Sequence, residues 1–552
     1  MTPRDDVATA PAAFRLTRDT LHRQGNGSAA ANLLTSAATT PVDGVLVAKW
    51  GAPNWARRLH RGTPSQGSQQ ASHKESSMRL INISQGSIGA HLLPLAVLGT
   101  AALAACSSDV PPELLDWLGH GHNDPGSGHR CTVHVAMTGD NANSGSSWEH
   151  AKRDIGPALA RAGDSGCDVW VQAGSYHPNP ERDGTPTLEL APGVALYGGF
   201  AGHERQLGDR VLSEATASVI DGTVDADDYS YMPLIQDAAH ATLDGFTVTG
   251  DRMEAPTLVS TSDSFTVRNS LFTGNYTLSS PVIQSTGASL QIVDSQFIDN
   301  DSLRAAVAGI QASGDDFLIE SSHFERIGAF AVIGVTGANP RILRSTFVRN
   351  GEDGPVLAGD GLLVEDCTFE RNQTAIEGAN LRIHRSRFVN NDTTPIGYAS
   401  GVYSTGGRTF ISNSTFSGNR GFHVVLAGTG IVIDHATIAH NDAFEGTFGG
   451  AVELHNSVVW GNSPPDCPPL PASCEPPMPT VATYSMSDEG LPPGEGNLPA
   501  QDPRFVDSMR NIGADSPLRD KADPESELRV DVDGDPRDDR PDIGAQEFVE
   551  GG

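Results

Sequence analysis

Residues 267–275 read VRNSLFTGN, and this phrase recurs with small changes through residues 267–462. Its pattern is an aliphatic residue, two variable residues, Ser, a variable residue, an apolar residue, two variable residues and Asn. Successive copies lie 19 to 28 residues apart, a period typical of stacked coils that cannot bury an apolar face alone. The other copies are IVDSQFIDN at 292–300, IESSHFERI at 319–327, ILRSTFVRN at 342–350, VEDCTFERN at 364–372, IHRSRFVNN at 383–391, ISNSTFSGN at 411–419, IDHATIAHN at 433–441 and LHNSVVWGN at 454–462.

The repeated units are rich in β-branched residues, Ser, Gly and Asn, and no helical period separates one copy from the next. We therefore predict an all-β fold, a single-stranded right-handed parallel β-helix of the pectate-lyase-like kind. A leucine-rich repeat also ends in Asn, but the leucines and connecting helices that it needs are missing.

Two columns of the repeat should form ladders inside this helix. Aromatic rings should stack from coil to coil, and each Asn should occupy a tight turn and bond to the turns above and below. The recurring Ser should also be structural, since it appears in every coil without a neighbouring base. The predicted ladders comprise Phe272, Phe297, Phe324, Phe347, Phe369, Phe388 and Phe416, with Asn275, Asn300, Asn350, Asn372, Asn391, Asn419, Asn441 and Asn462.

The β-helix is expected to span residues 131–462 and to begin with a cap. Strands are predicted at 133–137, 167–176 and 193–202, with a short amphipathic helix over 146–164 that begins at a Ser and ends at Gly163. A cap is needed because the open end of a parallel stack exposes unpaired backbone groups.

The N-terminal part of the chain has the organisation of an export signal. Residues 1–77 lack periodicity and are interpreted as a mis-called or disordered extension, so that 78–105 contains the signal itself. An apolar run too short to span a membrane leads to Leu103-Ala104-Ala105-Cys106, which resembles the lipobox of a bacterial lipoprotein. That resemblance implies acylation of Cys106 and a lipid anchor in the outer membrane. Residues 106–130 are then a linker.

Two further stretches carry a family resemblance. VHVAMTGDNANSGSSWEHA, DVWVQAGSYHP and GVALYGGFAGHERQ, together with the repeats, resemble bacterial surface β-helix proteins of the polymorphic outer-membrane-protein or adhesin-like kind. After a Pro-rich loop or linker at 463–499, residues 500–552 contain DPRFVD, SPLRD, DVDGDPR and DIGAQEF, which resemble the choice-of-anchor Q module. The resemblance implies a surface protein.

Composition limits the partners. The 552 residues contain 37 Lys and Arg against 68 Asp and Glu, a formal net charge of −31. Such a surface repels phosphate backbones, so nucleic acid is not an expected partner. We expect a monomer that touches the membrane only through its lipid.

Export permits disulfides. Cys467 and Cys474 close a small loop and are one candidate pair. Cys131 and Cys167 each begin a predicted strand and are another candidate pair if those strands are neighbours. Cys367 stands in the Ser column and should be a buried free thiol.

Acidic clusters offer two kinds of chemistry. The first is a calcium loop, since alternating carboxylates suit a hard cation, although Pro536 and Asp542 break EF-hand spacing and a solvated acidic turn is the alternative. The second is catalysis on acidic glycans, by a lyase or a hydrolase with clustered carboxylates and an Arg. The calcium candidates are Asp531, Asp533, Asp535, Asp538 and Asp542, and the catalytic candidates are Asp221, Asp225, Asp227, Asp228, Asp244, Asp315 and Asp316 with Arg268, Arg344 and Arg385.

The favoured function is a non-catalytic adhesin or glycan-binding scaffold whose partners are cell-surface glycans or the surface of a host or neighbouring cell. A polysaccharide lyase or glycoside hydrolase and a structural envelope component are the alternatives. Fold does not decide among them. Three or more carboxylates and an Arg in one concave groove would favour the enzyme.

Overall fold

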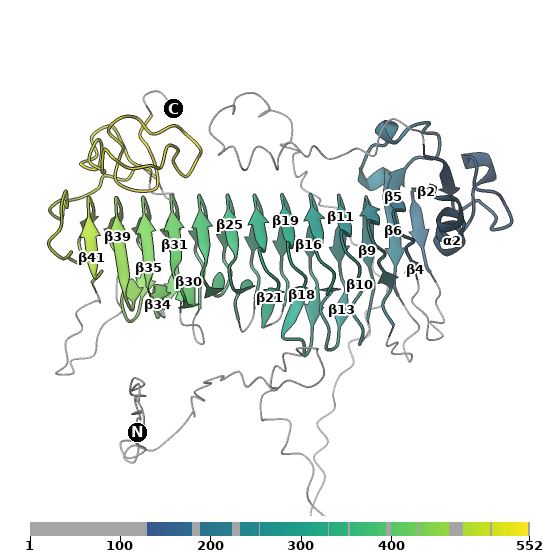
Figure 1. The fold of residues 1–552 in the computed structure, drawn as a ribbon, viewed down its shortest axis with the longest axis horizontal. Helices are drawn as coiled ribbons and strands as arrows, with labels where there is room; N and C mark the ends of the chain where they lie inside the picture. Colours follow the sequence, from purple (N-terminus) through teal and green to yellow (C-terminus); the bar gives the residue numbers. More distant parts are fainter. Residues whose placement is uncertain are drawn as a thin grey trace, which may run out of the picture. The chain divides into compact units, whose positions relative to one another are not determined.

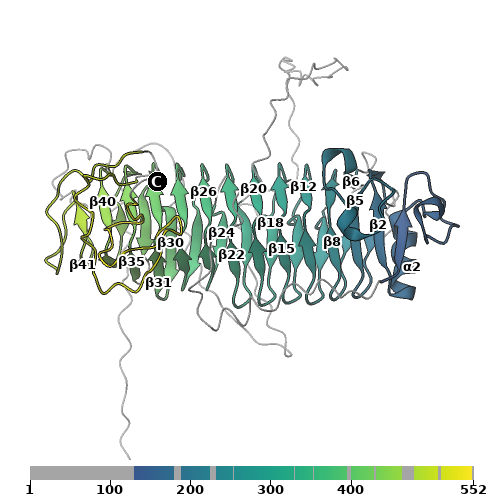
Figure 2. The same cartoon turned by 90° about the horizontal axis from the view of Figure 1, so that it is seen from above.

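The computed structural model describes residues 130–178, 188–223, 232–252, 254–328, 330–351, 354–393, 399–427, 430–462, 478–507 and 511–549. All of these belong to one compact unit, 110–552. Within them the chain winds through three long parallel sheets, which we name A, B and C, with 14, 13 and 11 described strands. A complete coil contributes one strand to each sheet, and the coils stack in a row (Figures 1 and 2). The predicted parallel β-helix is confirmed.

The strands of each sheet follow in chain order. Sheet A contains β1 (Thr132–Val135), β2 (Asp168–Gln172), β5 (Ala195–Phe200), β8 (Thr242–Asp244), β11 (Thr266–Arg268), β15 (Gln291–Val293), β19 (Leu318–Glu320), β22 (Arg341–Leu343), β25 (Leu363–Glu365), β28 (Arg382–His384), β31 (Thr409–Ser412), β35 (Ile431–Asp434), β39 (Val452–His455) and β41 (Val481–Thr483). Sheet B contains β3 (Gly174–Tyr176), β6 (Ser218–Asp221), β9 (Phe246–Thr249), β12 (Leu271–Thr273), β16 (Gln296–Ile298), β20 (His323–Glu325), β23 (Thr346–Val348), β26 (Thr368–Glu370), β29 (Arg387–Val389), β32 (Thr415–Ser417), β36 (Thr437–Ala439), β40 (Val458–Trp460) and β42 (Met486–Ser487). Sheet C contains β4 (Leu188–Glu189), β7 (Ile235–Gln236), β10 (Leu258–Ser260), β14 (Ile283–Ser285), β18 (Val307–Ala312), β21 (Ala331–Val335), β24 (Leu357–Gly359), β27 (Ile376–Ala379), β30 (Ala399–Gly406), β34 (His423–Ala427) and β38 (Phe448–Gly449).

Two short pairs at the corners complete the strands. They are β13 (Tyr276–Thr277) with β17 (Asp301–Ser302), and β33 (Arg420–Gly421) with β37 (Asp442–Ala443).

The core is built from the aromatic column of the repeat. The seven predicted Phe side chains, from Phe272 to Phe416, are all fully buried on successive strands of sheet B. Their ring centroids lie 4.5 to 5.0 Å apart with interplanar angles of 2 to 14°, so the rings stack in parallel. Ile438 and Val459 extend the same register. Burial of such rings is the main stabilising term of the coil.

The Asn column forms the second ladder, at the corner that follows sheet B. The side chain of Asn372 donates to the carbonyl of Phe347 at 2.9 Å and to Oδ1 of Asn391 at 3.2 Å. Its own Oδ1 accepts from the backbone and side chain of Asn350, at 2.9 and 3.2 Å. The predicted Asn ladder is therefore present, and it is interrupted at Ile327, which is buried and has no amide side chain.

The corner between sheets A and B is a third ladder, formed by the Ser column. The backbone N–H of Ser270 donates to Oγ of Ser295 at 3.3 Å, and the N–H of Ser295 donates to Oγ of Ser322 at 3.1 Å. Cys367 takes this place in one coil as a buried free thiol, and burial raises its pKa to about 12. The residue before each Ser adopts a left-handed conformation, as at Arg344 with φ 48° and Asp366 with φ 55°.

The N-terminal cap differs from the prediction in its helix. Residues 146–164 do not form one helix; a 3-10 turn η2 (Trp148–His150) precedes α2 (Ile155–Ser165). The helix begins after Asp154 and ends at Gly166, which is left-handed at φ 66°, so Gly163 lies inside it. Ile155, Ala158, Leu159 and Ala162 form its buried face. No helix of the described ranges is both long and apolar enough to cross a membrane.

The C-terminal end also differs from the expected boundaries. The stretch 463–499, interpreted as loop or linker, contains β41 and β42, which add one more rung to sheets A and B. The residues that follow pack beside the last coils (Figure 1), where Ile512, Leu518 and Ile543 share a core with Val458 and Met486. The C-terminal segment, which we define as 511–549, is thus part of the same folded unit.

Candidate functional site

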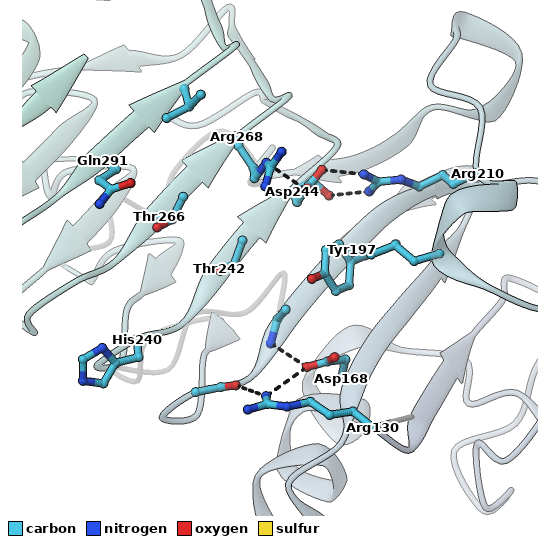
Figure 3. A pocket seen from close by; sticks show the side chains of 14 residues that line it. Arg130, Asp168, Tyr197, Arg210, His240, Thr242, Asp244, Thr266, Arg268 and Gln291 are labelled. Atoms are coloured by element: carbon cyan, nitrogen blue, oxygen red, sulfur yellow. Dashed lines mark hydrogen bonds and ion pairs between the residues drawn. The ribbon is translucent and has the colours of Figure 1, made fainter. Parts of the chain in front are cut away.

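A groove lies on the outer face of sheet A near the N-terminal cap (Figure 3). Its volume is about 600 Å³. Its lining is Arg130, Asp168, Gly193, Ala195, Tyr197, Leu207, Arg210, His240, Thr242, Asp244, Thr266, Arg268, Gln291 and Val293.

Strand register produces the floor of this groove. Tyr197 on β5 pairs with Asp244 on β8, which pairs with Arg268 on β11. A parallel row alongside contains Thr242, Thr266 and Gln291, again on successive strands. Because side chains alternate along a strand, the intervening residues point into the core, and these two rows face outward.

A segment between β5 and β6 builds one wall. Residues 201–217 include η3 (Leu207–Asp209) and η4 (Glu214–Thr216) and bring Leu207 and Arg210 to the groove. The base of the segment is fixed by Glu204, whose carboxylate accepts three consecutive backbone N–H groups at 2.6 to 2.9 Å. Burial opposes the charge, but these donors outweigh it and lower the pKa of Glu204. These hydrogen bonds therefore hold the wall in place at its base.

Gly245 allows Arg210 to approach the floor. Its φ is 79°, a left-handed value that costs glycine little. A Cβ at this position would lie 3.0 Å from Nη1 of Arg210 and 3.0 Å from Cδ2 of Leu212. Two requirements, the backbone conformation and the close packing, thus select glycine here.

Asp244 is the central carboxylate and is held on several sides. Nη2 of Arg210 lies 2.8 Å from its Oδ1, and Nε of Arg268 lies 3.4 Å from its Oδ2. Nδ2 of Asn269 also donates to Oδ1 at 3.1 Å. The side chains of Asp244 and Arg210 are only 4% and 10% exposed, whereas that of Arg268 is 41% exposed. Arg268 therefore presents its guanidinium to the groove.

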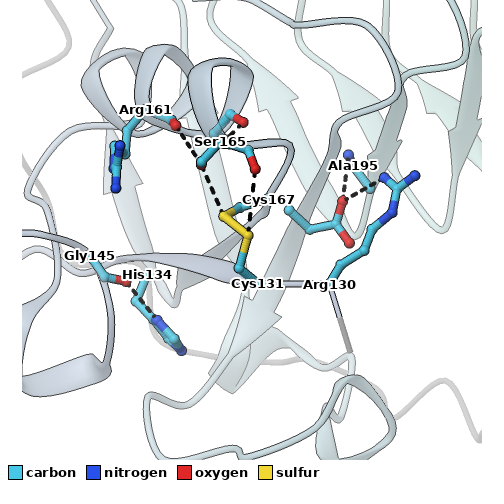
Figure 4. Close-up of a disulfide and its surroundings, with 10 residues drawn as sticks. Arg130, Cys131, His134, Gly145, Arg161, Ser165, Cys167 and Ala195 are labelled. Atoms are coloured by element: carbon cyan, nitrogen blue, oxygen red, sulfur yellow. Dashed lines mark hydrogen bonds and ion pairs between the residues drawn. A yellow bond between two sulfur atoms is a disulfide. The ribbon is translucent and has the colours of Figure 1, made fainter. Parts of the chain in front are cut away.

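The disulfide region forms the other end of the groove. Cys131 and Cys167, one of the two candidate pairs, are joined by a disulfide across β1 and β2 (Figure 4). The adjacent Arg130 donates to the carbonyl of Gly193 at 2.6 Å and lies 3.6 Å from Asp168. Burial raises the pKa of Asp168, although the N–H of Ala195 and Arg130 act against this. The disulfide thus fixes the strands that carry this ion pair.

Tyr197 lies between the two ion pairs. Burial, together with Asp168 and Asp244, raises the pKa of its phenol to about 12. The guanidinium carbon of Arg210 sits 5.5 Å from the ring centroid, a cation–π arrangement. The phenol keeps its proton at neutral pH, which makes it a hydrogen-bond donor.

Of the catalytic candidates, the structure brings only Asp244 and Arg268 together in this groove. Asp315 and Asp316 instead accept bonds from Ala338 and Asn339 at a corner of the coil. Arg344 pairs with Glu320 on the outer surface. Arg385 pairs with Glu365 and Asp366 there, and Asp221 bonds to Thr223. Cys106, Cys467, Cys474, Asp225, Asp227 and Asp228 lie outside the described residues.

The five calcium candidates lie in a turn in which carboxylates bond to the backbone. Asp531 accepts the N–H groups of Asp533 and Asp535 at 2.8 and 2.9 Å and that of Glu547 at 2.9 Å, so its oxygens brace a turn. Asp542 accepts in the same way from the backbone of two other residues, and Asp538 from the backbone of Arg540. Across the described part of the chain, no three His, Cys, Asp or Glu side chains form a group that could hold a metal ion.

Several groove residues were not anticipated from the sequence. Tyr197 lies in the strand predicted at 193–202, but it was not among the candidate site residues; it faces outward because the neighbouring Leu196 is buried. Arg130, Arg210 and His240 come from turns and from the 201–217 segment, and the repeat pattern holds no signal for where these approach the sheet.

Comparison with known proteins supports the fold. Residues 281–443 match a family model described as right handed beta helix region, and no curated protein matches the chain. The chain is thus a right-handed parallel β-helix protein, as predicted from its repeats.

Solved structures similar to the chain include two lyases and an adhesin. Pectate lyase Pel9A has a TM-score of 0.38 and 14% identity, covering 76% of this chain and 96% of its own. A rhamnogalacturonan lyase has a TM-score of 0.29 and 13% identity, covering 76% and 97%. PfbA, a surface adhesin of Streptococcus pneumoniae, has a TM-score of 0.31 and 12% identity, covering 54% and 89%. At this level of similarity the activity of this chain is left open.

Proposed function

We propose that this chain is an exported, lipid-anchored β-helix that binds glycans at the cell surface, as an adhesin or glycan-binding scaffold, and that it is not an enzyme. The observation that supports this is the groove on sheet A. It presents half-buried hydrogen-bonding side chains from a rigid floor, which is how a preformed ligand site is usually built.

The lining suits a hydroxyl-rich ligand. Thr242, Thr266 and Gln291 offer neutral donors and acceptors on neighbouring strands, which are spaced about 4.8 Å apart in a sheet. Tyr197 adds a phenolic donor and an aromatic surface, and Leu207 and Val293 add apolar contacts. A sugar presents both hydroxyl groups and apolar ring faces, so it can use each of these.

The same geometry argues against catalysis. A general acid or base needs a proton affinity near the working pH and freedom to meet the substrate. Asp244 is only 4% exposed and is held by two guanidinium groups, so it has little freedom to meet a substrate. The phenol of Tyr197 has its pKa raised to about 12. The two carboxylates of the groove are each paired with an arginine, Asp168 with Arg130 and Asp244 with Arg210, so neither is free to serve as the acid or base of a hydrolase.

Cell-surface location rests on the sequence around Cys106, which resembles a lipobox. Replacing it, Cys106→Ala, should move the protein from the membrane fraction to the soluble fraction and abolish incorporation of labelled palmitate. Unchanged membrane association would contradict the lipid anchor.

The binding function is tested on a glycan array, combined with assays for new reducing ends and unsaturated products on acidic polysaccharides. Thr242→Trp should occlude the groove and abolish array binding, because Thr242 lies on its floor. Thr346→Trp, on the outer face of β23 in sheet B, is the matched control and should bind normally.

The outcomes separate the three functions. Binding that Thr242→Trp abolishes, without product, supports the proposal. Product formation would indicate a polysaccharide lyase or glycoside hydrolase instead. If neither binding nor product is found, the proposal fails and a structural envelope component becomes the better explanation.

A further inference from the structure

Resting on the glycan-binding function proposed above, we infer that the groove selects a sparsely charged glycan. Its ligand is a saccharide with one acidic sugar, flanked by neutral sugars, whose carboxylate binds the guanidinium of Arg268. This assigns a ligand class and a specificity residue to the groove.

The first step is the charge of the lining. Three arginines face two carboxylates in the groove, whereas the whole chain carries a net charge of −31. Arg130 is matched by Asp168 at 3.6 Å, and Arg210 is matched by Asp244 at 2.8 Å. After this pairing one positive charge is left over, and it belongs to Arg268.

The second step is the availability of that charge. Asp244 already accepts from Arg210 and from Asn269, and Arg268 approaches it only through Nε at 3.4 Å. With 41% of its side chain exposed, Arg268 can offer its remaining N–H donors to a ligand. A guanidinium holds a carboxylate through two parallel hydrogen bonds, so it suits an acidic sugar.

The third step is that, apart from Asp244, which is paired with Arg210, the groove side chains on the strands beside Arg268 are uncharged. On its own row Tyr197 is an uncharged phenol and Val293 is apolar, and the neighbouring row holds Thr242, Thr266 and Gln291 (Figure 3). The hydroxyl and amide groups of Tyr197, Thr242, Thr266 and Gln291 can bind sugar hydroxyls, but none of them carries a positive charge that would compensate a second carboxylate. One acidic sugar therefore matches the groove, and a carboxylate on every residue does not.

The charge of the whole molecule acts in the same direction. A polymer with one carboxylate per sugar would be repelled by the net negative charge of the chain. A singly charged oligosaccharide meets little of this repulsion and still gains the local attraction of Arg268.

The test is isothermal titration calorimetry of the full mature protein with five probes. Two matched pairs are lactose with 3′-sialyllactose, and xylotetraose with the same oligosaccharide carrying one glucuronate. The fifth is tetragalacturonate, which is charged at every residue. We expect at least one singly acidic probe to bind about 10- to 100-fold more tightly than its neutral partner, the usual contribution of a charged hydrogen bond. Tetragalacturonate should bind more weakly than that probe.

Substitution then identifies the residue. Arg268→Gln should remove the preference of the singly acidic probe over its neutral partner. Arg382→Gln, an exposed arginine further along the outer face of sheet A, is the matched control and should keep the preference. Circular dichroism of both variants checks that they fold.

Several results would overturn the inference. Equal affinity for neutral and singly acidic probes, tightest binding of tetragalacturonate, no binding of any probe, or an unchanged preference in Arg268→Gln would each do so. The proposed function is tested separately on the array. It fails if the array shows no glycan binding, or only binding that Thr242→Trp does not abolish. A neutral glycan bound in the groove would leave that function standing and refute only the charge selectivity.

Discussion

At the scale of single residues, the Asn ladder is the part of the coil that depends most on one particular side chain. Each amide lies in a dry corner, where it satisfies backbone groups that no water can reach. For Asn372 these are the carbonyl of Phe347 and the N–H of Asn350. Removing the side chain leaves both without a partner, at a cost of about 1–3 kcal/mol for each buried group.

We therefore expect Asn372→Ala to lower the free energy of unfolding by about 2–4 kcal/mol. Denaturant or thermal unfolding of the purified protein measures this loss. Asn339→Gly is the control, because Asn339 is exposed and left-handed at φ 55°, a conformation that glycine adopts freely. Equal stability of Asn372→Ala and the parent would show that the ladder is not a stabilising device.

A second residue-scale prediction concerns His384 on β28. Burial, with help from Arg385, lowers its pKa to about 4, whereas an unfolded histidine titrates near 6.5. The native state thus requires the neutral ring, so His384 favours folding above pH 6.5 and opposes it as the pH falls toward 4.

Unfolding measured at pH 7 and at pH 4 should expose this contribution. On acidification His384→Gln should lose about 1–2 kcal/mol less stability than the parent, after allowance for solvent screening. Ser412→Ala removes the hydroxyl that lies 2.7 Å from Nδ1 of His384 but keeps the ring, so it should retain the pH dependence of the parent. Parallel stability curves for the parent and His384→Gln would contradict the prediction.

The residues of the coil core could be predicted from the sequence, whereas most residues of the groove could not. The Phe, Asn and Ser columns were predictable, because each recurs at a fixed place in the phrase and each meets its own kind in the next coil. The groove was not predictable, since Arg130, Arg210 and His240 reach it from turns whose paths depend on tertiary packing. Asp244 and Arg268 were candidates, yet nothing in their sequence separation distinguished them from Arg344 or Asp315.

At the scale of elements, the C-terminal segment is the informative case. Arg537 is buried within it, with a side chain only 1% exposed, and its Nη1 lies 3.0 Å from Oε2 of Glu547. Nη2 donates to Oδ1 of Asn413 at 3.0 Å, which ties the segment to the corner between β31 and β32. Removing one member of a buried ion pair costs about 3–5 kcal/mol, because the other charge stays in a dry site.

Arg537→Met should therefore release the C-terminal segment before the coils unfold. Limited proteolysis followed by mass spectrometry should find early cleavage within 511–549, and the free energy of unfolding of the segment should fall by about 3–5 kcal/mol. The double variant Arg537→Met, Glu547→Gln should recover part of the loss. Arg529→Gln, an exposed arginine of the same segment, is the control. Early cleavage in the coils instead would show that the ion pair stabilises the solenoid as a whole.

The packing of the C-terminal segment against the last coils explains why the boundaries predicted for the C-terminal end of the chain are wrong. Proline-rich composition around 463–499 indicated a linker, and β42 has Ser487 at the position of the Phe column in sheet B. Their register is set by pairing with β39 and β40 and by the core around Val458 and Met486, which are tertiary effects. The helix of the cap was misplaced for a similar reason, since Asp154 and Gly166 terminate it rather than the Ser and Gly163.

At the scale of the described unit, stability in a stack of coils is close to one-dimensional, because each coil touches mainly its neighbours. The ends are then the places where unfolding begins. At the N-terminal end, α2 covers the first coil and the disulfide between Cys131 and Cys167 links β1 to β2. At the other end the C-terminal segment contacts the last coils. At the N-terminal end, the backbone of Gly145 and Lys152 also bonds to the outer edge of β1, which would otherwise be open to pairing with other chains.

Removing the disulfide tests whether unfolding begins at the ends of the stack of coils. The double variant Cys131→Ser, Cys167→Ser should lose about 2–4 kcal/mol, a typical value for a crosslink of this kind. Hydrogen exchange should accelerate most in β1, α2 and β2, less in β5 and β8, and not at all around β23. A uniform acceleration along every coil would instead mean that the solenoid opens as one cooperative unit.

Cys367→Ser, which restores the usual residue of its column, is the control and should affect exchange only near residue 367. Because Arg130 and Asp168 adjoin the disulfide, the double variant should also weaken glycan binding, whereas Cys367→Ser should not.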